Sequence, residues 1–252
     1  MEIEPPMSLK EDAVKFVKDY FEKNGNSETK AIIGISGGKD SSTVAALCCE
    51  ALGRDRVFGV LMPNGVQSDI DYSRKLCDFL GIKNITVNIQ DGYNGLSETI
   101  KSAVGVDELS DQFKTNTPSR LRMTTLYGVA ALIGNARISC NGNLSERLAG
   151  FFTLWGDGAG DFAPLAYLYV SEVIQLGTEL GLPDELVHKA PSDGMCGMTD
   201  EDKLGFTYDE LQKVAEGKES EVAPAQVEKI RAKINSVSWK KELLNIPCFK
   251  YR

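Results

Sequence analysis

A short glycine-containing loop, residues 36–42, follows one apolar segment and opens another near the start of the chain. The apolar run at residues 31–35 precedes the loop, and a helix-compatible apolar segment continues from residue 43 to residue 52. A buried strand, a tight turn and a helix N-terminus in this order direct backbone N–H groups and the positive end of the helix dipole at one point. The loop therefore predicts an anion-binding site, and phosphate is the anion that it suits.

The side chains of this loop favour polyphosphate together with a metal ion. Gly37 and Gly38 let the backbone approach phosphate oxygens closely, and Lys39 adds a positive charge. The hydroxyl donors of the loop are Ser36, Ser41 and Ser42. Asp40 departs from the pattern, because a carboxylate beside polyphosphate is repelled unless a cation lies between them. We therefore interpret Asp40 as a magnesium ligand.

The spacing of the loop identifies the class of phosphate chemistry. It differs from the Walker pattern, in which two glycines five positions apart are followed by Lys and then Ser or Thr. The loop instead resembles the SGGxDS pyrophosphate-binding loop of ATP pyrophosphatases, which split ATP between its α and β phosphates. A Gly-Gly turn that binds nothing is the alternative interpretation of these seven residues alone.

Composition sets broad limits on the function. A chain of 252 residues that is 42% hydrophobic and 25% charged can bury a full core as a single α/β domain. The net charge is -8, and no run of four basic residues occurs, so a nucleic-acid partner is not expected. Without a leader-like start or an apolar run of membrane-spanning length, we expect a cytoplasmic protein that does not associate with membranes.

Cysteine and histidine content excludes several kinds of site. The six cysteines form no C-x-x-C pair, and we expect most of them to be small buried residues. His188 is the single histidine, which excludes a metal site made of several histidines. The chemistry of this chain must therefore run without histidine clusters.

Apolar periodicity predicts alternating strands and helices. Helices are expected at residues 8–24, 43–52, 69–80, 119–135 and 167–180, and strands at residues 31–35, 57–62, 85–89 and 137–140. This order is typical of a doubly wound, mainly parallel sheet with helices on both faces, a Rossmann-like α/β fold that binds ligands at the carboxyl ends of its strands. Breakers and acids at residues 191–207 predict a mobile lid at about residues 193–206.

In the segments given next, the chain resembles the ammonia-dependent NAD synthetases over nearly its whole length. The matching segments are residues 36–42, 63–67, 120–123, 143–146, 150–153, 156–157, 161, 189–194, 199–201 and 204–209. The resemblance implies the adenine nucleotide alpha-hydrolase-like fold. It also implies amidation of nicotinic acid adenine dinucleotide (deamido-NAD) to NAD by ammonia, with ATP converted to AMP and pyrophosphate through an acyl-adenylate. No enzyme nucleophile is required in such a reaction.

The resemblance implies a set of ATP-binding and catalytic residues. Those at the nucleotide are Gly34, Ile35, Ser36, Gly37, Gly38, Lys39, Asp40, Ser41, Asn141, Lys189 and Thr207. Asp40 and Glu146 would hold Mg²⁺, and with Lys189 they would form the catalytic set. Glu146 follows a predicted strand end, so both acids can converge at the carboxyl edge of the sheet. A glutamate that merely serves the dipole of a helix is the alternative interpretation of Glu146.

Four residues match positions that bind the dinucleotide in the family: Arg120, Asp161, Trp239 and Lys240. The chain departs from the family pattern at two places. Leu154 stands where many members have a lysine, and Trp239 precedes Lys240 where the family has a His-Lys pair. The Trp239 indole can stack on a ring of the substrate, or it can be a buried anchor of the fold.

The resemblance also implies a homodimer. Free ammonia is the expected nitrogen source, because every cysteine lies within the synthetase-like region. Two alternatives remain at this point. One is another ATP pyrophosphatase that amidates or thiolates a different substrate, such as a GMP synthetase or a tRNA-thiolating enzyme. The other is a nucleotide-binding module without turnover.

Overall fold

A parallel sheet forms the centre of the computed structural model, which describes residues 8–188, 199–242 and 248–251. Its four strands are β1 (Lys30–Gly34), β2 (Val57–Leu61), β3 (Lys83–Thr86) and β4 (Ala136–Ile138). They lie in the order β3-β2-β1-β4, and Ile32 of β1 is in register with Phe58 on one side and Ile138 on the other. The expected parallel α/β fold is confirmed.

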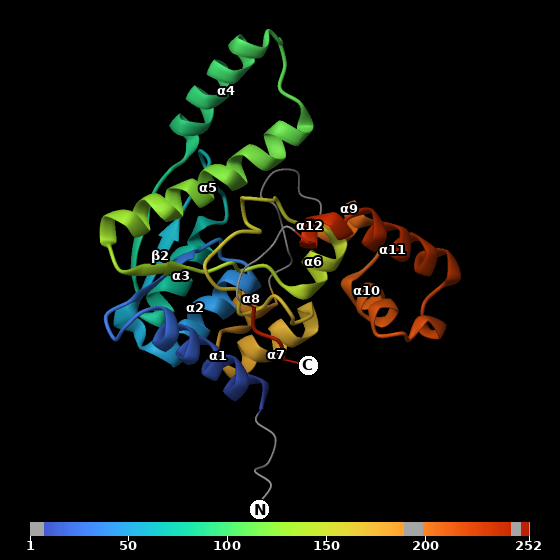
Figure 1. Ribbon diagram of the computed structural model, residues 1–252, viewed down its shortest axis with the longest axis horizontal. Coiled ribbons are helices and arrows are strands. Elements are labelled where there is room, and N and C mark those ends of the chain that lie inside the picture. Colours follow the sequence, from blue (N-terminus) through green and yellow to red (C-terminus); the bar gives the residue numbers. More distant parts are fainter. Residues whose placement is uncertain (1–7, 189–198, 243–247, 252) are drawn as a thin grey trace, which may run out of the picture.

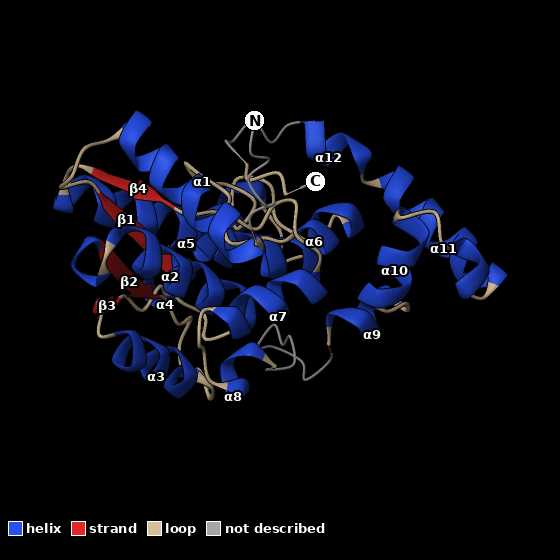
Figure 2. Ribbon diagram, turned by 90° about the horizontal axis from the view of Figure 1, so that it is seen from below, coloured by secondary structure: helices blue, strands red, loops and turns tan. Residues whose placement is uncertain are grey.

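The sheet is covered on both faces, as its apolar strands require. On one face lie α1 (Leu9–Asn24), α2 (Lys39–Leu52), α3 (Ile70–Leu80) and α7 (Val170–Glu179), with the short α8 (Asp184–Val187) beside them (Figures 1 and 2). On the other face lies α5 (Asp111–Ile133). Because successive side chains of a strand point to opposite faces, Ile33 packs in the first core and Ile32 in the second.

The chain order around β1 creates a place for a ligand. From β1 the chain runs outward through β2 to β3, and it then returns to place β4 on the opposite side of β1. Ligands of open α/β sheets bind at such a switch point, outside the carboxyl ends of the strands. The glycine-containing loop after β1 and residues 139–143 after β4 both lie there.

The helix expected at residues 119–135 begins earlier, at Asp111, and ends at Ile133. Ser110 is its N-cap and accepts a hydrogen bond from the Phe113 backbone N–H at 3.2 Å. From the sequence, Pro118 indicates a helix boundary, because a proline disfavours helix at the preceding residue. In the structure Pro118 lies buried inside the helix. With α4 (Gln90–Val104), the first part of this long helix forms the arm at the top of Figure 1, and the rest of the helix runs along the sheet.

A second group of helices follows the sheet and forms its own core. It contains α6 (Leu144–Ala149), α9 (Asp200–Leu204), α10 (Tyr208–Ala215), α11 (Pro224–Ser236) and α12 (Ser238–Glu242). Its buried apolar side chains include Phe206, Leu211 and Ile230. We call this group the helical lobe; it lies to the right in Figure 1.

Other element boundaries differ from the sequence-based expectations by a few residues. The third strand ends at Thr86, because residues 87–89 lead into α4, and α2 already begins at Lys39. Of the expected lid, residues 193–198 lie outside the described part of the chain, and residues 200–204 form α9. Across the described ranges, no helix combines the length and the apolar character that a membrane span needs.

Candidate active site

The loop between β1 and α2 has a backbone conformation that only glycine adopts readily. Gly37 has φ +75°, and a Cβ atom there would lie 2.8 Å from the Ser73 backbone nitrogen and 2.9 Å from the Tyr72 Cβ. Gly38 is the N-cap of α2 and provides no side chain to cap the helix. The first N–H groups of α2 therefore face the loop without a side-chain acceptor at the N-cap, which is the arrangement that binds anions.

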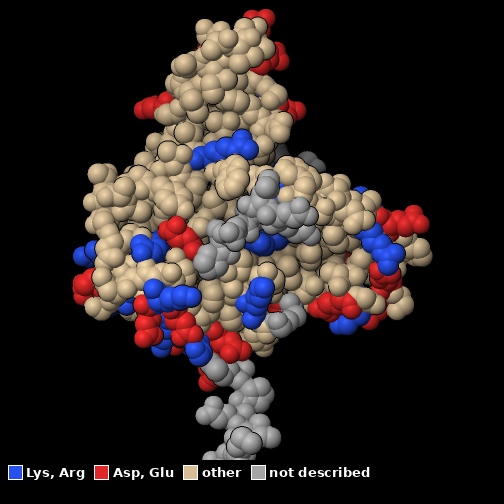
Figure 3. Space-filling view, viewed as in Figure 1, with Lys and Arg blue, Asp and Glu red and all other residues tan. Residues whose placement is uncertain are grey.

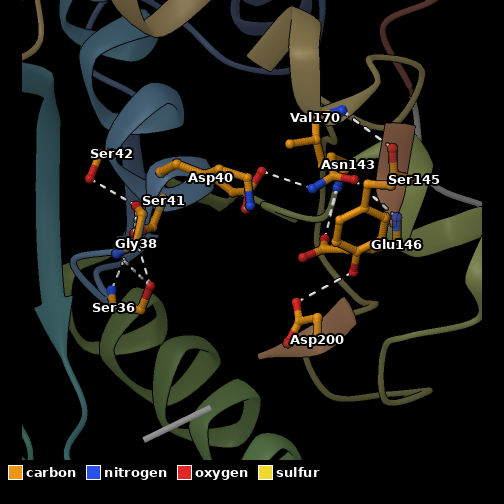
Figure 4. A network of polar contacts seen from close by, with 12 residues as sticks. Ser36, Gly38, Asp40, Ser41, Ser42, Asn143, Ser145, Glu146, Val170 and Asp200 are labelled. Atoms are coloured by element: carbon orange, nitrogen blue, oxygen red, sulfur yellow. Dashed lines mark hydrogen bonds and ion pairs between the residues drawn. The ribbon is translucent and has the colours of Figure 1, made fainter. Parts of the chain in front are cut away.

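The serines of the loop hydrogen-bond to one another and to the loop backbone. The Ser36 and Ser41 hydroxyl oxygens are 3.1 Å apart, and Gly38 N–H donates to the Ser36 hydroxyl at 3.3 Å. Ser41 and Ser42 hydroxyls donate to the Gly38 carbonyl oxygen at 3.1 and 2.9 Å. These hydrogen bonds hold the three serine hydroxyls close to the Gly38 backbone, as Figure 4 shows.

The opposite wall of the site begins with the N-terminus of α6. Asn143 is its N-cap, and its side chain accepts from the Glu146 N–H at 3.0 Å while Glu146 accepts from the Asn143 N–H at 3.1 Å. This reciprocal pair is a capping box. The Asn143 side-chain amide also donates to Asp40 Oδ1 at 2.9 Å, which ties α6 to α2 across the site (Figure 4).

The structure brings Asp40 and Glu146 together, as the sequence predicts. Glu146 also serves its helix N-terminus, so the alternative interpretation describes part of its role. Burial, followed by the charge of Asp40, raises the pKa of Glu146 well above its usual value. The site therefore holds a desolvated carboxyl group close to a second acid, and this arrangement is typical of a site that is completed by a cation.

Two further residues of this wall were not assigned a role from the sequence. Asp200, at the first position of α9, is buried, and Tyr208, at the first position of α10, donates its hydroxyl to Asp200 Oδ2 at 3.3 Å. Burial and the charges of Glu146, Asp200 and Asp40 raise the pKa of Tyr208, so its hydroxyl stays protonated. Burial also raises the pKa of Asp200. Both lie in segments that match the family, residues 199–201 and 204–209, but their spacing indicates no role, because the fold of the helical lobe brings them to the site.

The donor set at the site suits Mg²⁺. Mg²⁺ is usually held by one or two carboxylates together with water and substrate phosphate oxygens. Asp40 and Glu146 supply two carboxylates beside a phosphate-type loop. Within the parts of the chain that the structure describes, no group of three or more His, Cys, Asp or Glu side chains is placed to hold a metal without further ligands.

The remaining nucleotide candidates fall in different places. The Asn141 side-chain amide donates to the Gly34 carbonyl oxygen at 3.1 Å, so this residue lies against the end of β1. Thr207 is the N-cap of α10, where its hydroxyl oxygen accepts from the Glu210 N–H at 3.1 Å. Lys189 lies outside the described residues. Ile35, at the start of the loop, is buried in the core.

Two of the four dinucleotide candidates hold the same short segment, residues 150–154. Arg120 Nε donates to the Leu154 carbonyl oxygen at 3.2 Å. Lys240 Nζ donates to the carbonyl oxygens of Gly150 and Phe152 at 2.9 and 3.0 Å and lies over the Phe152 ring. These contacts place Arg120 and Lys240 around one backbone segment that also carries the Leu154 departure.

The other two dinucleotide candidates, Trp239 and Asp161, lie in different surroundings. Trp239, next to Lys240 on α12, leaves 53% of its surface exposed, so the interpretation as a buried anchor is wrong. Asp161 lies beside β4, where Oδ2 accepts from the Ile138 N–H at 2.8 Å and Oδ1 accepts from the Tyr127 hydroxyl at 3.2 Å. In this structure Asp161 thus extends the hydrogen bonding of the edge strand.

Comparison with known proteins identifies the family. The NAD synthase family model matches residues 9–243. The chain is 39% identical over 196 residues to the NH(3)-dependent NAD(+) synthetase of Pyrococcus furiosus, covering 77% of this chain and 72% of that protein. The residues matched by the family model include the sheet, the glycine loop and the helical lobe.

Solved structures agree with this result. The NMN synthetase from Francisella tularensis aligns with a TM-score of 0.83 and 32% identity, over 96% of this chain and 99% of that one. The NH3-dependent NAD synthetase from Campylobacter jejuni aligns with a TM-score of 0.75 and 25% identity, over 94% and 97%. The chain whose loop, paired acids and helical lobe are described above belongs to the NAD synthase family.

Proposed function

We propose that this protein is an ammonia-dependent NAD synthetase that amidates deamido-NAD, with ATP converted to AMP and pyrophosphate. The observation that carries the proposal is that Asp40 and Glu146 lie close together beside the glycine loop. The chain that holds them belongs to the NAD synthase family. Within an ATP pyrophosphatase, such a pair supports attack at the α-phosphate and departure of pyrophosphate.

In the proposed reaction, the nicotinate carboxylate attacks the α-phosphate, and ammonia then attacks the acyl carbon and releases AMP. The loop N–H groups and serine hydroxyls hold the phosphates, and Lys189 is proposed to contact them. Asp40 and Glu146 would hold Mg²⁺, which supplies charge stabilisation for the leaving pyrophosphate. The protein therefore contributes position and charge, with no covalent enzyme intermediate.

The proposal is tested by incubating the purified protein with ATP, Mg²⁺, ammonium and deamido-NAD, followed by chromatography. We expect NAD, AMP and pyrophosphate in equal amounts, and at least about a hundredfold slower formation of all three with Asp40→Asn. Pyrophosphate release without NAD would point to another acceptor, in line with the alternative ATP pyrophosphatases. An absence of turnover with intact ATP binding would favour the nucleotide-binding module.

One observation favours a second candidate substrate, nicotinic acid mononucleotide. The solved structure titled NMN synthetase aligns with this chain at a higher TM-score than the Campylobacter NAD synthetase does. Leu154 also removes a cation that the resemblance assigns to the dinucleotide, and Lys240 is bound to backbone carbonyl oxygens. Parallel measurement of kcat/KM for the two acids decides between them: a higher value for the mononucleotide would assign the protein to NMN synthesis.

The arm formed by α4 and α5 supports the proposal of a homodimer. Leu96, Ile100 and Val104 follow one another at four-residue spacing, so they lie on one face of α4, and all three are exposed. Val104, the last residue of α4, is 67% exposed. Figure 3 shows this arm as largely uncharged on the visible face, with acidic side chains at its rim.

A second copy of the chain is the occupant that we propose for this apolar arm, because exposed apolar surface of this kind marks an interface. Analytical ultracentrifugation should show a dimer, and the double variant Ile100→Glu, Val104→Glu should sediment as a monomer. A wild-type monomer at micromolar concentration would contradict the proposal.

We also propose a cytoplasmic location. Cys48, Cys49, Cys77 and Cys140 are thiols in the structure, as expected for proteins of a reducing compartment. Fractionation of cells that express the natural gene, followed by immunodetection, tests this proposal.

A further inference from the structure

The lysine of the glycine loop contacts a carboxylate of the site. Lys39 is the first residue of α2, and its side chain is only 6% exposed. Its Nζ donates to Asp40 Oδ2 at 3.0 Å. From sequence, this lysine is a positive charge for phosphate, yet here its ammonium group lies on the proposed metal ligand itself.

Asp40 contacts this ammonium directly, in an ion pair that is shielded from water. Glu146 lies on the same side of the site, because Asn143, whose side chain accepts from the Glu146 N–H, also donates to Asp40 Oδ1. Asp40, which lies close enough to Glu146 for the two carboxylates to repel each other, therefore has a cation beside it in the absence of metal.

We propose that Lys39 is a built-in counter-cation of the metal site, which keeps Asp40 and Glu146 together without metal and opposes metal binding until ATP is present. The proposal rests on the assignment of Mg²⁺ to Asp40 and Glu146 under the proposed function. It gives a physical role to the Lys39 ammonium, which contacts Asp40 in the structure.

The electrostatics of the site lead to a defined order of binding. A metal ion that reaches Asp40 without nucleotide must displace or repel the ammonium, and this repulsion is strong because the site is shielded from water. The negative charge of the triphosphate changes the balance. The lysine stem is flexible and its ammonium has three donors, so Lys39 can turn from Asp40 to a phosphate oxygen while the metal takes its place. Metal binding then depends on nucleotide.

Mn²⁺ binding to the intact protein tests this proposal, because free Mn²⁺ is measured by electron paramagnetic resonance without any turnover. In the absence of ATP, we expect Lys39→Gln to bind Mn²⁺ at least about tenfold more tightly than the wild type, a difference of roughly 1.4 kcal/mol. Lys39→Arg, which keeps the charge, should behave like the wild type. The control Lys18→Gln removes the same charge from an exposed position of α1 and should change nothing.

Addition of ATP should raise the Mn²⁺ affinity of the wild type at least about tenfold and largely remove the difference from Lys39→Gln. Equal Mn²⁺ affinities of Lys39→Gln and the wild type without nucleotide would overturn the proposal. If neither Lys39→Gln nor Lys39→Met folds, the wild type still decides: tight Mn²⁺ binding without ATP would also overturn it.

Asp40→Asn separates this inference from the proposed function. If Asp40→Asn abolishes Mn²⁺ binding with ATP while Lys39→Gln has no effect, only the counter-cation role is wrong. If Asp40→Asn leaves Mn²⁺ binding with ATP unchanged, the metal assignment itself is wrong, and the inference falls with it.

Discussion

The two walls of the active site differ in how the sequence encodes them. The phosphate wall, formed by β1, the glycine loop and α2, comes from one continuous stretch of chain. The acidic wall combines Asn143 and Glu146 of α6 with Asp200 of α9 and Tyr208 of α10. A wall built locally can be recognised from its spacing, whereas a wall assembled by tertiary packing needs the fold.

The strongest test of this comparison removes the residue that joins the walls. Asp40 lies on the phosphate wall and accepts from Asn143 of the acidic wall. Asp40→Asn should lower magnesium-dependent turnover at least about a hundredfold, because a metal ligand and a charge are lost, while the fold stays intact. Steady-state kinetics and thermal melting measure the two effects. Asp55→Asn, at an exposed position, is the control, and near-normal activity of Asp40→Asn would remove Asp40 from the metal site.

A second test addresses the phosphate wall alone. Gly37→Ala places a side chain at φ +75° and within 2.8 Å of the Ser73 backbone nitrogen, so we expect a loss of stability of about 2 kcal/mol and weaker ATP binding. Gly53→Ala has a similar strain, with φ +84°, but no atom lies within 4 Å of the new Cβ. Denaturant unfolding and ATP calorimetry should show a smaller stability loss and normal ATP affinity for Gly53→Ala. Equal effects of both substitutions would mean that close packing at Gly37 is unimportant.

The acidic wall should show a cost in stability. Burial and the charge of Asp40 raise the pKa of Glu146, so between its unfolded and folded pKa values the folded protein binds more protons than the unfolded chain. In that window, stability falls as pH rises. Without metal, Glu146→Gln should therefore melt a few degrees higher than the wild type at pH 7, a gain of roughly 1 kcal/mol, while turnover is lost.

The gain of Glu146→Gln should disappear when melting is measured near pH 4, where the wild-type carboxyl group is also protonated. Glu28→Gln, at an exposed position, should melt like the wild type at both pH values. A lower melting temperature for Glu146→Gln at pH 7 would show that the glutamate stabilises the metal-free fold.

The smallest effect is expected outside both walls, at the Trp239 indole. If the indole stacks on a ring of the acid substrate, Trp239→Ala should raise KM for deamido-NAD by up to about tenfold. The melting temperature should stay unchanged, since the side chain is about half exposed. Phe79→Ala, which removes an exposed aromatic ring from α3, should alter neither quantity. An unchanged KM for Trp239→Ala would exclude stacking.

Much of the fold follows from the sequence, for reasons that individual elements make clear. Apolar runs marked β1, β2 and β4 to within two residues at each end, because buried parallel strands are continuous apolar segments. The start of α5 was missed because Pro118 reads as a helix boundary, while the packing of the surrounding chain keeps it inside the helix. The edge strand β3 is exposed along its length, so its apolar signal is weak.

The site was predictable only in part. Asp40 stands out because a carboxylate in a phosphate-binding loop requires a cation nearby. Glu146 was assigned because it follows a predicted strand end, in a segment that resembles the family. Asp200 has no such local pattern, and only the packing of the helical lobe buries it beside Tyr208. The buried ion pair between Lys39 and Asp40 is likewise seen only in the folded structure.

The transfer of oxygen during turnover tests the central claim most directly. Deamido-NAD labelled with ¹⁸O in its nicotinate carboxylate is incubated with the protein, ATP, Mg²⁺ and ammonium, and the products are analysed by mass spectrometry. If the carboxylate attacks the α-phosphate between the two walls, one ¹⁸O atom must appear in AMP, because the acyl C–O bond breaks when ammonia adds. NAD formation with unlabelled AMP would contradict the proposed acyl-adenylate route.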